Sequence, residues 1–139
     1  MSSQPGGYSG TPVVRKLGIK PEARVALIGA PQGFDETLGE LPPGVAVRRS
    51  LRGRFDVAVA FFVARGALEV RLPALKASLE PAGGLWIAWP KRSSGVDTDL
   101  TETVVRELGL TAGLVDNKVC AVDQVWSALR FVYRLADRP

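Results

Sequence analysis

The residues best suited to chemistry lie in one polar loop, Lys91 to Asp99, which follows a short apolar run. That run, residues 85–89, carries no charge and is typical of a strand covered on both faces. Pro90 cannot donate to a sheet ladder, so we expect the strand to end there. The candidate ligand-binding side chains of the loop are cations, hydroxyls and a carboxylate: Lys91, Arg92, Ser93, Ser94, Thr98 and Asp97. This set suits a phosphorylated or carboxylated ligand.

A helix is expected directly after this loop. The sequence from Asp99 to Glu102 fits a capping box, and Gly109 is predicted to end the helix. The loop would then lie beside a helix N-terminus at the carboxyl end of a strand, where open α/β sheets bind ligands. An alternative stays open, because turns and helix caps use the same hydroxyl and carboxylate residues without any ligand.

A second candidate site is the turn after the first predicted strand, where Gly29 and Gly33 flank Ala30-Pro31-Gln32. In a parallel sheet this turn, the arginine-rich segment 48–54, residues 64–66 and the 90–99 loop should share the carboxyl edge. The turn at 123–126 is a further candidate for this edge. The arginines at 48, 49, 52 and 54 are equally well explained as a solvated connection.

Composition excludes several kinds of chemistry. The 139 residues contain no histidine and one cysteine, so neither a Ser-His-Asp triad nor a cysteine or histidine zinc site can form within the chain. The single cysteine suits a reducing compartment, and no apolar run is long enough to span a membrane, so we expect a cytoplasmic protein. The net charge of +4 favours anionic partners only mildly.

Residue patterns predict a flexible Gly/Ser-rich tail over 1–10 and a single domain over 11–139. Strands are expected at 24–29, 45–47, 55–63 and 85–89, with helices at 13–17, 35–38, 67–79 and 100–108. Alternation of strands and helices indicates a parallel sheet with helices on both faces. Two runs near the end, 114–122 and 126–135, indicate a closing antiparallel pair, and the second could expose an apolar edge to a second copy of the chain.

Two segments resemble the class I S-adenosylmethionine methyltransferases. Residues 79–87, LEPAGGLWI, are similar to the helix–Pro–Gly–Gly–strand segment of those enzymes, and FDVAV at 55–59 is similar to one of their strands. The resemblance implies a three-layer, Rossmann-like, mostly parallel α/β sheet with an antiparallel C-terminal strand pair. It also implies S-adenosylmethionine as a cofactor.

Nearly the whole chain also resembles a small, largely actinobacterial family of unknown function. The segments carrying this resemblance are residues 7–12, 16–19, 86–91, 98–101, 115–123 and 126–127. That family supplies no activity to carry over.

The chain departs from the methyltransferase pattern at the cofactor positions. Those enzymes have an acidic residue and a glycine-rich turn after the first strand, whereas this turn contains Pro31 and has no preceding acid. They also place an acidic residue at the end of the second strand, where this chain has Arg48 and Arg49. Neither the dinucleotide-binding glycine pattern nor a phosphate-binding loop is present.

These observations favour a non-enzymatic binding or regulatory domain whose partner is a small anion or another protein. One alternative is a divergent methyltransferase, in which Asp97 or Asp123 orients the acceptor. The other is an interaction module acting as a homodimer. Nucleic acid is not favoured, because aromatic residues make up only 7% of the chain and do not alternate with basic ones.

Overall fold

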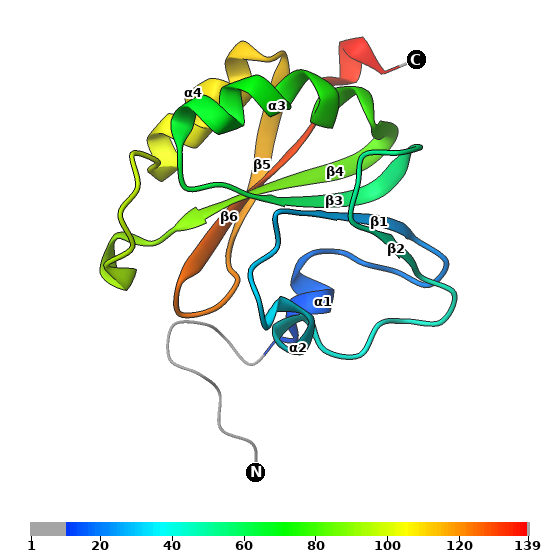
Figure 1. Ribbon diagram of the computed structural model, residues 1–139. Helices are drawn as coiled ribbons and strands as arrows, with labels where there is room; N and C mark the ends of the chain where they lie inside the picture. Colours follow the sequence, from blue (N-terminus) through cyan, green and yellow to red (C-terminus); the bar gives the residue numbers. More distant parts are fainter. Residues whose placement is uncertain (1–10, 139) are drawn as a thin grey trace.

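The computed structural model describes residues 11–138, so the tail predicted at 1–10 lies outside the described residues. One six-stranded sheet forms the centre of the molecule, in the order β2-β1-β3-β4-β6-β5 (Figure 1). Its strands are β1 (Arg24–Ile28), β2 (Ala46–Arg48), β3 (Phe55–Phe61), β4 (Leu79–Pro90), β5 (Leu114–Ala121) and β6 (Trp126–Tyr133). The helices are α1 (Val13–Lys16), α2 (Phe34–Leu38), α3 (Arg65–Ala77) and α4 (Glu102–Thr111), with single 3₁₀ turns at Arg92–Ser94 and Leu135–Asp137.

Helices cover both faces of the sheet, as predicted. Helices α3 and α4 lie on one face and the short helices α1 and α2 on the other (Figure 1). The alternation of side chains along each strand divides the core into two halves. Ala58, Ala60 and Ile87 face α3 and α4, whereas Val59 and Trp86 face α1 and α2. The three-layer, Rossmann-like expectation is confirmed.

The closing strand pair is antiparallel, also as predicted, but β6 is not an edge strand. Strands β2, β1, β3 and β4 run parallel, and β6 pairs antiparallel with β4 on one side and with β5 on the other. The expected apolar edge at 126–135 is therefore wrong, because its backbone groups are already paired. The exposed edges of the sheet belong to the three-residue β2 and to β5, whose edge is interrupted by a bulge between Asp116 and Lys118.

Strand β4 begins much earlier than predicted. Residues 79–84 were expected to end a helix and turn, yet they already pair with β3, with an irregularity in register between Phe55 and Val57. Gly83 explains the difference, since a Cβ there would lie 2.9 Å from the Asp56 carbonyl oxygen. The glycine allows close approach of two strands rather than a turn.

Helix α4 also differs from its prediction at both ends. It begins at Glu102, and the side chain of Thr101, not Asp99, accepts from the Val104 amide at its N-terminus. It continues past Gly109 to Thr111, because Gly109 is where the helix presses against the Phe131 ring of β6. Helix α3 is continuous through Pro73, which lies exposed on its surface.

Candidate functional site

The first candidate, the turn after β1, lies at the carboxyl edge of the sheet. Gly29 and Gly33 both adopt left-handed backbone conformations, with φ of 67° and 88°. A Cβ at Gly29 would lie 3.1 Å from the Phe61 carbonyl oxygen, so this glycine allows β1 and β3 to end side by side. Gly33 precedes α2 with no atom closer than 3.9 Å to its Cβ position, so the turn is open on that side.

The carboxylates near this turn are placed differently from those expected of a methyltransferase. At the end of β2, Arg49 donates two hydrogen bonds of 2.8 and 2.9 Å to Asp35 in the first turn of α2. The next residue, Glu36, is exposed and makes no ion pair with any residue from 11 to 138. Its Oε1 is the atom 3.9 Å from the Cβ position at Gly33, so this carboxylate faces the glycine turn. An exposed carboxylate therefore lies beside this turn, and it comes from α2 rather than from β2.

The second candidate, the loop after β4, lies at the same edge, with β3 between it and β1. Its distal half is tied to the neighbouring strand and helix. The Thr98 hydroxyl donates to the Val63 carbonyl at 2.5 Å, and the Asp99 carboxylate accepts from the Arg65 amide at 2.7 Å. Asp99 thus caps α3 across the loop instead of capping the helix that follows it.

In the proximal half of the loop, Arg92 is exposed and Lys91 is half-buried. Ser94 is occupied locally, donating to the Lys91 carbonyl at 2.6 Å and accepting from the Val96 amide. The Lys91 ammonium and the Arg92 guanidinium make no ion pair within the described part of the chain, and Ser93 and Asp97 are exposed. Of the six candidates in this loop, Ser94 and Thr98 therefore have structural roles, Lys91 is half-buried, and Arg92, Ser93 and Asp97 are exposed.

A hollow of about 250 Å³ opens between this loop and the start of α4. The residues lining it are Trp89, Pro90, Arg92, Val96, Thr98, Leu100 and Thr101. Trp89 is itself only 5% exposed, so it forms the floor of the hollow rather than a free stacking surface. A small ligand with one anionic group could bind here through Arg92.

The turn at 123–126 is a structural support. The Asp123 carboxylate accepts from the amides of Val125 and Trp126 at its Oδ1 atom, each at 2.8 Å. The Trp126 ring packs edge-on against Phe61 at 5.1 Å between centroids.

Only the first part of the predicted arginine segment lies near the carboxyl edge, where Arg49 binds Asp35 of α2. Arg48 ends β2, but residues 49–54 then run back across the sheet to the start of β3, bringing Arg52 and Arg54 beside Arg24. Arg24 could not be assigned to this group from the sequence, because it lies in a different predicted strand, far from the arginine segment in the chain.

Residues 11–138 contain neither a cluster of metal-binding side chains nor a helix that could span a membrane. No group of three or more His, Cys, Asp or Glu residues is placed to hold a metal ion. No helix in this range is both long and apolar enough to cross a membrane.

Comparison with known structures identifies the fold. The chain is similar to an S-adenosylmethionine-dependent methyltransferase of Aquifex aeolicus, with 17% identity, a TM-score of 0.61 and 86% of each chain covered. It is similar to 1,6-didemethyltoxoflavin-N1-methyltransferase of Burkholderia thailandensis, solved with S-adenosylhomocysteine, at 18% identity and a TM-score of 0.60, covering 86% of this chain and 76% of that one. A TehB-like methyltransferase of Corynebacterium glutamicum matches at 13% identity and a TM-score of 0.57, with 92% and 90% covered.

The protein therefore has the Rossmann-like fold of the S-adenosylmethionine-dependent methyltransferases. At these identities the likeness shows the fold alone. Neither the family models nor the curated proteins gave a match, so the resemblance to an actinobacterial family stays a prediction. The expected non-enzymatic, anion-binding role gains no support from the comparisons.

Proposed function

We propose that this protein binds S-adenosylmethionine at the carboxyl edge of its sheet and is a divergent methyltransferase. The observation that carries the proposal is the turn after β1, where two left-handed glycines open beside the ends of β1 and β3. Ligands of open α/β sheets bind in this position. Structures of the same fold support the choice of ligand, because several of them are described with S-adenosylhomocysteine bound.

The chain has groups suited to the different parts of this cofactor. Gly33 lets ligand atoms approach the backbone of the turn closely, since no atom lies closer than 3.9 Å to its Cβ position, whereas the space beside Gly29 is taken by the Phe61 carbonyl. Glu36 is the unpaired carboxylate facing that turn, and we assign it to accept hydrogen bonds from the ribose hydroxyls. When bound, the cofactor supplies the methyl group.

The acceptor is assigned to the hollow beside the 91–99 loop. Arg92 supplies a cation at its rim and the Thr101 and Thr98 side chains line its wall, which suits a small acceptor bearing a carboxylate or phosphate. Asp97, exposed on the same loop, remains the candidate for orienting the acceptor.

Equilibrium binding of S-adenosylhomocysteine to matched variants tests the cofactor assignment. Glu36→Gln should weaken binding about tenfold or more, because a hydrogen bond to a charged group contributes about 1.5–3 kcal/mol. Glu107→Gln on α4, an equally exposed glutamate, should bind like the unchanged protein. Equal affinity of the two variants would remove the assignment of Glu36, and absence of binding to the unchanged protein would remove the proposal itself.

A further inference from the structure

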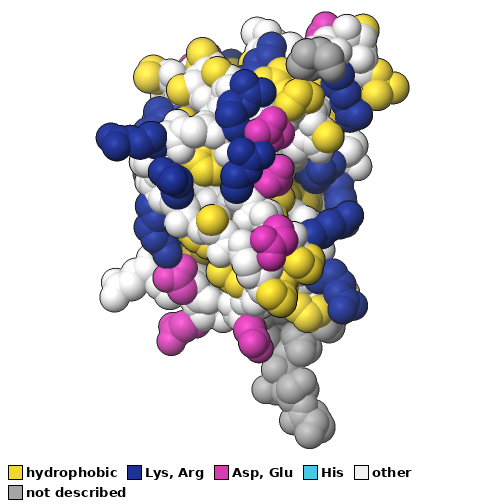
Figure 2. All heavy atoms as spheres, turned by 90° about the vertical axis from the view of Figure 1, so that its right-hand side faces the viewer, with side chains coloured by type: hydrophobic (Ala, Val, Ile, Leu, Met, Phe, Trp, Pro, Cys, Tyr) yellow, Lys and Arg dark blue, Asp and Glu magenta, His cyan; other side chains and the backbone are white. Residues whose placement is uncertain are grey.

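A second hollow lies far from the carboxyl edge and is lined by arginines. It encloses about 320 Å³, and its lining consists of Arg24, Ala46, Arg48, Arg52, Gly53, Arg54 and Phe55. Figure 2 views the side of the molecule where the parallel strands begin, and shows Lys and Arg side chains there on both sides of a row of acidic ones. The proposed cofactor site does not include any of these residues.

The hollow exists because the connection from β2 to β3 is unusually short. Parallel strands are normally joined by a crossover of a dozen or more residues, often containing a helix. Here residues 49–54 cross over β1 without a helix, and only Leu51 packs onto the core from this loop. The sheet face beside this loop is therefore left uncovered, and this uncovered area is the hollow. Ala46 and the almost fully buried Phe55 form the floor of the hollow.

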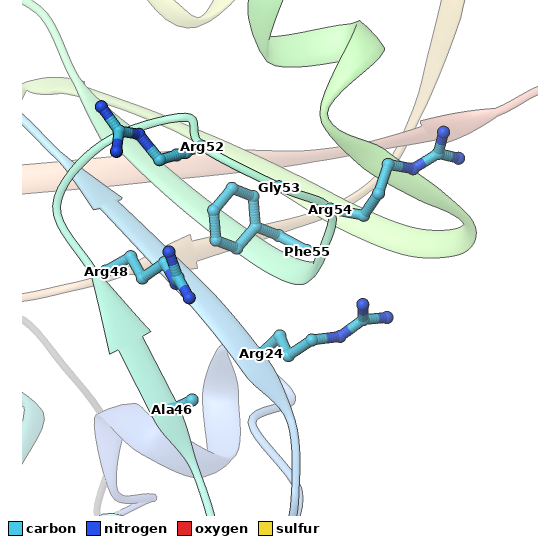
Figure 3. A pocket seen from close by; sticks show the side chains of 7 residues that line it. All are labelled: Arg24, Ala46, Arg48, Arg52, Gly53, Arg54 and Phe55. Atoms are coloured by element: carbon cyan, nitrogen blue, oxygen red, sulfur yellow. The ribbon is translucent and has the colours of Figure 1, made fainter.

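The four arginines that line this opening come from three separate segments. Arg24 comes from β1, Arg48 from β2, and Arg52 and Arg54 from the crossover loop. In Figure 3 the Arg48 side chain extends toward the Phe55 ring, whereas Arg24, Arg52 and Arg54 extend outward from the rim of the hollow. Gly53, with φ of 98°, makes the turn that separates the two loop arginines.

Two of the arginines are fixed in place and two are free. Arg24 donates to Glu80 at 2.6 Å and lies 3.5 Å from Asp56, and these hydrogen bonds raise its pKa. Arg54 donates to the Leu79 carbonyl and lies 3.9 Å from Glu80. Arg48 and Arg52 have no ion pair among residues 11–138. Four guanidinium groups therefore share two carboxylates, which leaves two positive charges uncompensated.

We propose that this hollow is a binding site for a small phosphate-bearing ligand with at least two negative charges. Guanidinium groups match phosphate oxygens through paired N–H donors, and Arg24 and Arg54 are held by their carboxylates before any ligand arrives. The volume is that of a small-molecule site. The buried Phe55 ring offers no stacking face, so recognition rests on charge and not on a base.

Calorimetric titration with inorganic pyrophosphate at low salt tests the proposal. Saturable binding to one site is expected. The affinity for pyrophosphate should be at least tenfold lower in the double variant Arg48→Ala/Arg52→Ala. A matched control, Arg15→Ala/Arg71→Ala, removes two exposed arginines of α1 and α3 and should bind as the unchanged protein does. All four side chains are exposed, so melting temperatures should stay the same in both variants.

A short DNA duplex in a parallel titration separates a small ligand from a nucleic-acid backbone. Pyrophosphate binding that depends on Arg48 and Arg52 supports the proposal, whether or not the duplex also binds. The proposal would be overturned if pyrophosphate did not bind, or if only the duplex bound. It would also be overturned if the control variant lost as much affinity for pyrophosphate as the Arg48→Ala/Arg52→Ala variant. The outcome is independent of S-adenosylhomocysteine binding, since the two sites share no residue.

Discussion

At the scale of single residues, glycines with different roles look alike in the sequence. Gly109 has the form of a helix stop, yet it lies within α4 because the Phe131 ring occupies the space where a side chain would be. Gly29 and Gly33 were identified only as glycines flanking a turn, and the structure gives both a left-handed φ. Tertiary contacts of this kind come from residues distant in sequence, so a local pattern cannot reveal them.

Gly109→Ala is predicted to destabilise the protein by about 1–3 kcal/mol, because the new methyl group overlaps the Phe131 ring in a close-packed core. Helix propensity alone predicts the opposite sign, a gain of about 1 kcal/mol. Denaturant unfolding measures the difference.

The control is Gly66→Ala in the first turn of α3, where nothing lies within 4 Å of the added methyl group. This change should be neutral or stabilising. A Gly109→Ala protein as stable as the Gly66→Ala protein would contradict the packing described for α4 and β6.

Cys120 is predicted to be a slow nucleophile. Burial raises the pKa of its thiol, and the nearby Lys16, Lys118 and Lys91 oppose this shift only in part. At pH 8 its alkylation by iodoacetamide should therefore be slower than that of a free thiol, and its rate should keep rising above pH 9, since the thiolate is the reactive form. A rate that reaches half of its maximum at or below about pH 8.5, the pKa of a free cysteine, would contradict this.

The same shift has a consequence for stability. The unfolded thiol ionises near pH 8.5 and the folded thiol at higher pH, so the folded state holds its proton longer. The free energy of unfolding should fall as pH rises above about 8.5. Cys120→Ala should remove this part of the pH dependence, as measured by urea unfolding between pH 7 and 10.

At the scale of elements, the 91–99 loop is held at its far end and exposed at its near end. The sequence placed it correctly after a buried strand, because an uncharged run followed by proline and polar residues has a local cause. It could not assign the hydrogen bonds of Thr98 and Asp99, whose partners Val63 and Arg65 lie more than thirty residues earlier. Asp99 was predicted to cap the helix that follows the loop, but its carboxylate instead accepts from the Arg65 amide at the start of α3.

Asp99→Ala should destabilise the protein by about 1 kcal/mol, because the Arg65 amide at the start of α3 loses its acceptor. Asp97→Ala, two residues away and exposed, should have no measurable effect on the melting temperature. Similar losses in the two variants would mean that the loop is not attached to α3 through Asp99.

At the scale of the whole molecule, the order of strands and helices was predictable and the location of the arginines was not. Apolar runs and helical periodicity in the sequence indicate which residues are buried in strands and helices. The parallel sheet and the antiparallel closing pair could therefore be predicted from these patterns. A connection of six residues that crosses back over β1 leaves no such pattern. It moves Arg52 and Arg54 away from the carboxyl edge, so the hollow that they line is separate from the hollow beside Arg92.

The same arrangement leaves the carboxyl edge with one candidate cofactor turn, at Gly29–Gly33, and one candidate acceptor hollow beside Arg92. Calorimetric titration of the unchanged protein with S-adenosylmethionine and S-adenosylhomocysteine tests this assignment most directly. We predict saturable heat with one site per chain for both molecules, and competition between them. Absence of heat at high concentrations of both would contradict the central claim, and would mean that the methyltransferase fold has been kept here without its usual ligand.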